Sequence, residues 1–168
     1  MLRLFLAGLA ALSISAPSLA QACADRDHGL LPHFIGEWQS DGDAFGRPAQ
    51  SRMTWSSVME GCFHQLEYLI ETNPGTEEAW TFRGRGTHYI VEGEVEGHWI
   101  DNNGDLHDLR GSATDTELLV YWGEATDQLG RSRYALTEDG AIQVTDWILN
   151  DEGWQQFNDN RFERVAND

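Results

Sequence analysis

Apolar and polar residues alternate with a period of two along most of the chain after residue 34, which is the pattern of strands with one buried face. Short dipeptides interrupt the alternation, and Glu60-Gly61, Asn103-Gly104 and Asp139-Gly140 have the composition of two-residue hairpin loops. The pattern predicts strands at 34–44, 49–59, 62–72, 78–90, 93–101, 105–114, 117–125, 131–138, 141–149 and 154–165. Before them, the polar lead 25–34 has room for a single helical turn ahead of Pro32.

These strands, joined by short connections, indicate a meander of antiparallel neighbours. A sheet of this size removes its unpaired edges by closing, so the sequence predicts an all-β fold, a single antiparallel up-and-down β-barrel of about 8–10 strands. The barrel domain spans 34–166 and follows an N-terminal lead, 21–33. A two-sheet sandwich is the alternative, but its crossing connections need longer loops than most of those present here.

Residues 1–20 have the order of a signal peptide: a charge at Arg3, an apolar run over 4–16, and small residues up to Ala20. The apolar run is too short for a membrane span. We therefore expect the protein to be exported, either periplasmic or secreted, with no transmembrane segment. The alternative is a lipoprotein with its lipid on Cys23, although the polar Gln21 departs from the usual pattern before such a cysteine.

Export changes the interpretation of the two cysteines. In an oxidising compartment, Cys23 and Cys62 predict a structural disulfide that ties the N-terminal lead onto the domain. A reactive thiol at Cys62, two residues from His64, is the functional alternative. Nothing else in the sequence supports that second interpretation.

Charge excludes several classes of function. The formal net charge is −17, from 28 acidic against 11 basic residues, and every basic residue is arginine. The chain has no basic run that could neutralise phosphates, so nucleic acid is not an expected partner. Without lysine there is no Schiff-base chemistry and no P-loop, and no group of residues has the spacing typical of a metal site.

The hairpin around Glu60-Gly61 predicts which side chains point into the barrel. Centring the turn there pairs residues of the two strands as follows: Met53 with Tyr68, Trp55 with Leu66, Ser57 with His64 and Met59 with Cys62. The opposite face holds Gln65, Glu67 and Glu71, which belong in water. The face with the aromatic and aliphatic residues is therefore the predicted interior.

The same reasoning, with the turn centred on Asn103-Gly104, predicts which side chains of the next hairpin point inside. Acidic residues alternate with Val95 and Trp99, so these two point inside. The parity then brings Asp101, Asp108 and Arg110 inside and turns His98 and His107 out. An interior arginine beside two carboxylates is either a structural ion pair at the barrel mouth or the polar end of a ligand pocket.

At the third hairpin, centring the turn on Asp139-Gly140 places Arg133 opposite Asp146. Both faces of this hairpin are equally apolar. The sequence therefore leaves open which of them points inside.

The segment Phe34-Ile35-Gly36-Glu37-Trp38 is similar to the Gly-x-Trp signature that opens lipocalin-like barrels. Further segments match in order and spacing: 97–104, 130–134, 154–157 and 161–164. Together they resemble an uncharacterised bacterial family of exported lipocalin-like (calycin) domains. The resemblance implies the barrel fold and carries no agreed activity. It also implies that Trp38 packs across the closed end, so that Gly36 and Trp38 are structural.

A sister group of such barrels binds haem through a histidine near the C-terminus. Here the last histidine is His107, so the expected axial ligand is missing and the sequence argues against haem. His64 and His88 lie on apolar faces, where a histidine is more often a hydrogen-bonded core residue than a ligand. The cofactor, if there is one, stays unknown.

We expect a barrel that binds a small hydrophobic or amphipathic ligand. The candidate pocket residues are Trp55, His64, Tyr68, Trp80, His88, Trp99, Asp101 and Arg110, with Leu66 and Phe82 completing the walls. One alternative is a hydrolase- or isomerase-type enzyme that uses His64 with Ser57 or a nearby acid, although no nucleophile elbow is visible. The other is an envelope interaction module with a solid core. The oligomeric state is left open.

Overall fold

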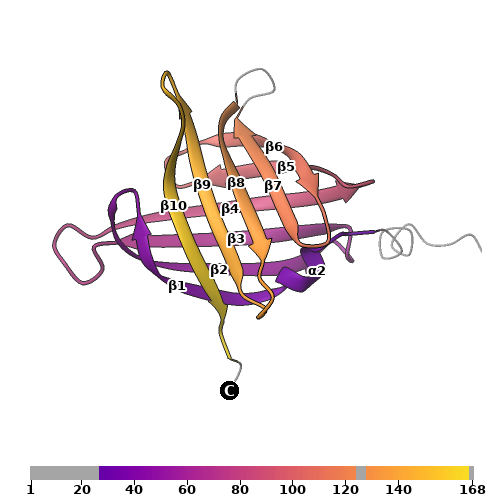
Figure 1. Cartoon of the computed structure of the whole chain (residues 1–168), viewed down its shortest axis with the longest axis horizontal. Helices are drawn as coiled ribbons and strands as arrows, with labels where there is room; N and C mark the ends of the chain where they lie inside the picture. Colours follow the sequence, from indigo (N-terminus) through magenta and orange to yellow (C-terminus); the bar gives the residue numbers. More distant parts are fainter. Residues whose placement is uncertain (1–26, 124–127, 167–168) are drawn as a thin grey trace, which may run out of the picture.

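The computed structural model describes residues 27–123 and 128–166, which form a closed barrel of antiparallel strands in sequence order. The strands are β1 (Gly36–Ala44), β2 (Arg47–Val58), β3 (Phe63–Thr72), β4 (Trp80–Val91), β5 (Glu94–Asp101), β6 (Leu106–Ala113), β7 (Glu117–Gly123), β8 (Gln128–Leu136), β9 (Ile142–Asn150) and β10 (Gly153–Arg164), and a short helix, α2 (Leu31–Phe34), precedes them. Pairing of β1 with β10 closes the barrel. In Figure 1, β8 to β10 cross over β2 to β4, as the two walls of a barrel do.

The predicted fold class is confirmed, and the alternation of side chains explains why these segments form strands. In β2, for example, Ala49, Ser51, Met53 and Trp55 are buried while the residues between them are exposed. Strand β2 thus has one dry and one wet face. The helical turn predicted before Pro32 lies slightly later: α2 begins at Leu31 and carries Pro32 in its first turn, where the missing N–H of proline costs no helical hydrogen bond.

The register predicted for the first hairpin is confirmed. Strands β2 and β3 pair Met53 with Tyr68, Trp55 with Leu66 and Ser57 with His64. The face that carries Met53, Trp55 and Tyr68 is buried, as expected. Met59 lies in the turn rather than in the ladder and is 74% exposed.

The interior position predicted for Arg110 is wrong. Strands β5 and β6 pair Trp99 with His107, one residue away from the predicted register. The loop has three residues rather than two, because the backbone N–H of Asp101 donates to the carbonyl of Asp105 at 3.2 Å and Gly104 takes φ +93°. A slip of one residue reverses every side chain. Arg110 is therefore exposed opposite Glu96.

The same slip also turns Asp108 outward, where its carboxylate lies 3.3 Å from Nδ1 of His98. In exchange, His107 points inside. His98 and His107, both expected on the outer face, thus lie on opposite faces of the sheet.

The third hairpin differs from its prediction for the same reason. The backbone N–H of Thr137 donates to the carbonyl of Ala141 at 2.9 Å, and Gly140 takes φ +84°, so this loop also has three residues. Asp146 consequently pairs with Ser132 instead of Arg133. The predicted pair of Arg133 with Asp146 is wrong.

The two members of that predicted pair lie on opposite faces. Asp146 is buried inside the barrel. The guanidinium Nε of Arg133 lies outside, 2.6 Å from a carboxylate oxygen of Glu117. The structure thus settles which face of this hairpin points inward.

One end of the barrel is closed by α2. Leu31 and Phe34 are fully buried there, and the indole N–H of Trp38 donates to the carbonyl of Phe34 at 2.7 Å. The guanidinium of Arg164 lies 4.2 Å from the Trp38 ring centroid and donates to the carbonyl of Ile35 at 2.7 Å. Gly36 lies under this guanidinium, where a Cβ atom would collide with Arg164. Gly36 and Trp38 therefore belong to the structure of the closed end.

The predicted signal peptide and Cys23 lie outside the described residues. Cys62 is disulfide-bonded and is not a free thiol, which leaves no support for a reactive cysteine at this position. The pairing of Cys62 with Cys23 stays a prediction. Among the described residues, no helix has the length and apolar character needed to cross a membrane.

Candidate binding cavity

A cavity of about 480 Å³ occupies the barrel at the end away from α2. Because β1 starts beside α2 and the strands run up and down, the β1–β2, β3–β4 and β5–β6 connections all lie at this opposite end. Residues of these connections line the mouth, among them Phe45, Asn103 and Asp105. The barrel is therefore hollow at this end and plugged at the other.

Aromatic side chains make a large part of the cavity wall. They are Phe45, Tyr68, Trp80, Phe82, Trp99, Trp122, Tyr134 and Phe157. Phe45 stacks on Phe157 with ring centroids 5.0 Å apart, and Phe82 stacks on Trp99 at 6.3 Å. Trp80 is 42% exposed at the rim. The rings pack against one another along the wall and leave the centre open.

Two glycines make room for the indoles that line the wall. A Cβ atom on Gly84 would lie 1.9 Å from Cζ2 of Trp99, and one on Gly130 would lie 2.0 Å from Cζ2 of Trp122. Each indole therefore lies flat across the backbone of a neighbouring strand. With any other residue at these positions, the ring would have to move.

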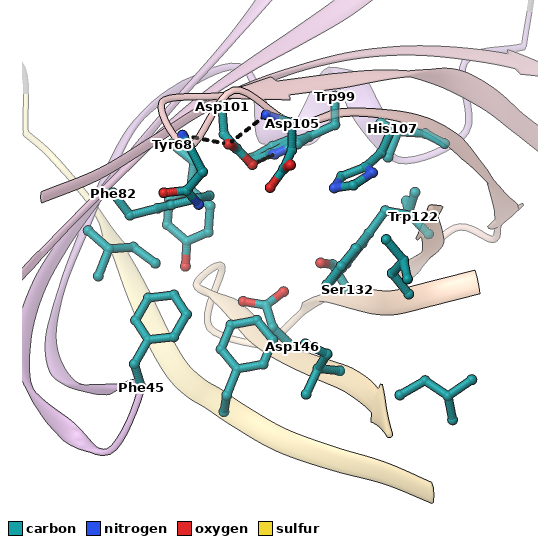
Figure 2. A pocket seen from close by; sticks show the side chains of 18 of the residues that line it. Phe45, Tyr68, Phe82, Trp99, Asp101, Asp105, His107, Trp122, Ser132 and Asp146 are labelled. Carbon is teal, nitrogen blue, oxygen red and sulfur yellow. Dashed lines mark hydrogen bonds between the residues drawn. The ribbon is translucent and has the colours of Figure 1, made fainter. Parts of the chain in front are cut away.

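A polar group forms the floor of this aromatic cavity. Asp146 on β9 is 4% exposed, and Nδ2 of Asn158 on β10 donates to its Oδ2 at 2.6 Å. The same amide lies 3.1 Å from the hydroxyl of Tyr68, and Ser132 also hydrogen-bonds to the Asp146 carboxylate. Figure 2 shows Tyr68, Ser132 and Asp146 pointing into the cavity from three different strands.

The electrostatics of the floor are set by burial. Removal from water raises the pKa of Asp146 from 3.8 to about 6, although the hydrogen bonds from Ser132 and Asn158 lower it in part. Burial also raises the pKa of Tyr68 well above its usual value. At neutral pH, Asp146 is thus a buried carboxylate, and its hydrogen-bond partners are neutral groups.

Two neighbouring histidines lie deeper in the barrel. His64 and His88 are direct partners across β3 and β4, and both are buried. The pKa of each is lowered to about 4, mainly by burial, and in His64 the nearby His28 contributes to the lowering. Both rings are therefore neutral at pH 7. His88 lines the cavity, whereas His64 lies beyond its wall.

The positions of Ser57 and His64 do not support a serine–histidine catalytic dyad. Ser57 lies opposite His64, as predicted, but Ser57 is exposed at the end of its strand. Nδ1 of His64 has no hydrogen-bond partner among the described residues. A nucleophile and its base need a direct hydrogen bond or one through water.

The structure brings five of the eight predicted pocket residues together around the cavity: Tyr68, Trp80, His88, Trp99 and Asp101. Trp55 and His64 are buried outside its lining, where Trp55 packs on Phe34 and Tyr134 near α2. Arg110 lies on the outer surface. Sequence reasoning missed Trp122, Ser132 and Asp146 as cavity residues. Shifting the predicted register of this hairpin by one residue pairs Ser132 with Asp146 and would have placed both in the cavity.

At the rim, Asp101, Asp105 and His107 have potential metal-ligating atoms within 4.8 Å of one another. The Asp101 carboxylate is already used in the loop, because it accepts hydrogen bonds from the backbone N–H of Asn103 at 2.9 Å and from the indole of Trp99 at 3.2 Å. This is the arrangement of a loop cap. We do not assign a metal to it.

In comparisons with known proteins, no family model matches the chain, and no curated protein matches it either. The cavity and its residues therefore carry the functional argument.

Proposed function

We propose that this protein binds a small, partly apolar molecule in the barrel cavity. The observation that carries the proposal is an open cavity of about 480 Å³ that is walled by aromatic side chains and has a few polar groups at its floor. Small-molecule sites typically have volumes of roughly 300–1,000 Å³ and this mixture of apolar walls with few polar contacts. A module that acts only through its outer surface has no need of such a cavity.

Export and membership of the family of lipocalin-like domains belong to the same proposal. The signal-peptide pattern of residues 1–20 and the Gly-x-Trp segment at Gly36–Trp38 support them. Catalysis by His64 has weaker support, because this histidine lies outside the cavity lining and its Nδ1 has no hydrogen-bond partner among the described residues.

Fluorescence titration tests the binding proposal. The uncharged probe N-phenyl-1-naphthylamine is titrated into the protein while tryptophan fluorescence is recorded. Trp80, Trp99 and Trp122 line the cavity, so their emission reports on a bound probe. We expect saturable quenching of tryptophan emission together with enhanced probe emission. A linear, non-saturating response with this probe and with a panel of uncharged aromatic and aliphatic compounds would refute the proposal.

A further inference from the structure

Among the described residues, the cavity lining carries more acidic than basic side chains. Three aspartates line the cavity, Asp101, Asp105 and Asp146, and none of the described lining residues is an arginine. The chain has no lysine. The two histidines in the lining are the remaining basic groups, and His88 is neutral at pH 7 because burial lowers its pKa to about 4.

Asp146 is the central feature of this imbalance. It is 4% exposed, and none of the ion pairs among the described residues includes it. Its hydrogen bonds come from the neutral groups of Asn158 and Ser132. A buried carboxylate without a counter-charge is costly, so a cation placed beside it would gain a strong interaction.

The walls suit the same kind of ligand. Figure 2 shows Phe45, Phe82, Trp99 and Trp122 around the space in front of Asp146. The faces of aromatic rings attract cations, most strongly when water is excluded, and they also pack against apolar groups. The carboxylates of Asp101 and Asp105 lie at the mouth, where they draw positive charge toward the opening and repel anions.

From these observations we infer that the cavity selects organic cations, in which a protonated amine or quaternary ammonium group lies beside Asp146 and an apolar body packs among the aromatic side chains. This inference rests on the proposed function and names its ligand class. Fatty acids and other carboxylates are excluded, because they would bring a second negative charge to a floor that already holds one.

Three ligands that share one ring system test the inference by calorimetry at pH 7.5: 1-naphthylmethylammonium, its uncharged analogue 1-ethylnaphthalene, and the anion 1-naphthylacetate. We expect the cation to bind roughly tenfold or more tightly than the uncharged compound, and the anion to bind more weakly than either. Equal affinities for the cation and the uncharged compound would overturn the inference while leaving the proposed function intact. Failure of all three ligands and of N-phenyl-1-naphthylamine would instead remove the proposed function.

Substitution of Asp146 tests whether this residue causes the preference for the cation over the uncharged compound. In Asp146→Asn, we expect the preference for the cation to fall to about a few-fold or less, with 1-ethylnaphthalene binding unchanged. Asp115→Asn is the matched control, because it removes the same charge from an exposed position between β6 and β7 at the closed end. A preference that survives Asp146→Asn would overturn the assignment to this residue. If Asp146→Asn does not fold, the ligand series on the unmodified protein still decides the charge class.

Discussion

Nδ2 of Asn158 donates a 2.6 Å hydrogen bond to Oδ2 of Asp146, and this contact fixes the buried carboxylate that forms the floor of the cavity. The two residues belong to neighbouring strands, and a bulge between Gln156 and Asn158 shifts the register at this point. A bulge redirects side chains locally, and here it accompanies the pairing of Asn158 with Asp146. The polar floor is thus part of the sheet itself.

Removing this amide should destabilise the fold. We expect Asn158→Ala to lower the free energy of unfolding by about 1–3 kcal/mol at pH 7.5, because a buried carboxylate loses a donor and the Tyr68 hydroxyl loses its partner. Urea unfolding followed by tryptophan fluorescence measures the change. Asn103→Ala, at an exposed position on the rim, is the control and should shift stability by less than about 0.5 kcal/mol. Equal stability of the two variants would mean that the floor network contributes nothing.

The buried ionisable groups predict a definite pH dependence of stability. Because His64 and His88 have pKa values of about 4 in the folded state against 6.5 in the unfolded chain, the unfolded chain binds more protons between these values. Their contribution makes the free energy of unfolding rise from pH 4 to 6.5. Asp146 acts in the opposite direction, because its pKa of about 6 lies above 3.8 and the folded state holds the proton more tightly.

Two histidines against one carboxyl should give a net rise in stability across this pH range. We expect Asp146→Asn to steepen the rise and His88→Gln to flatten it, as measured by urea unfolding at intervals between pH 4 and 7. His98→Gln is the control, since this side chain is exposed on β5. A slope that is the same in all four proteins would show that these groups do not titrate differently in the folded and unfolded states.

The glycine beneath Trp122 should be needed to keep the cavity open. In Gly130→Ala, the new methyl group collides with the indole, so we expect the ring to turn into the cavity and the affinity for N-phenyl-1-naphthylamine to fall several-fold. Fluorescence titration measures this. In the double variant with Trp122→Leu, the collision is relieved and probe binding should recover in part. If the single variant binds the probe as well as the unmodified protein does, the indole is not held in place by this contact.

The closed end depends on Arg164. We expect Arg164→Ala to lower the free energy of unfolding by about 1–3 kcal/mol, because it removes a cation–π contact with Trp38 and hydrogen bonds to the carbonyls of His33 and Ile35. Arg161→Ala is the comparison: that arginine makes exposed ion pairs, which are worth about 0–1 kcal/mol. Thermal unfolding of both variants ranks them. A larger loss in Arg161→Ala would contradict this account of the closed end.

The sequence predicts the strands well because buried and more exposed positions alternate along strands such as β2 and β3. The register of the first hairpin was also predictable, since Met53, Trp55 and Tyr68 share one face while Glu67 and Glu71 lie on the other. In the other two hairpins, the dipeptides Asn103-Gly104 and Asp139-Gly140 have the composition of a two-residue loop. In the structure the glycine is the third residue of a three-residue loop.

That difference of one residue accounts for most errors at the site. It placed Arg110 inside in place of His107, and it paired Asp146 with Arg133 instead of Ser132. The cavity itself could not be predicted from composition. Its volume depends on whether Trp99 and Trp122 lie along the wall or fill the centre, and that is decided by glycines on neighbouring strands.

The central claim, that the barrel interior is a binding site, is tested most directly by filling it. Val120 on β7 lines the cavity, whereas Leu119 beside it points outward. The measurement is the dissociation constant of N-phenyl-1-naphthylamine for Val120→Phe and for Leu119→Phe. The account predicts that Val120→Phe weakens binding by roughly tenfold or more and that Leu119→Phe binds like the unmodified protein. Equal binding by both variants would contradict a site inside the barrel.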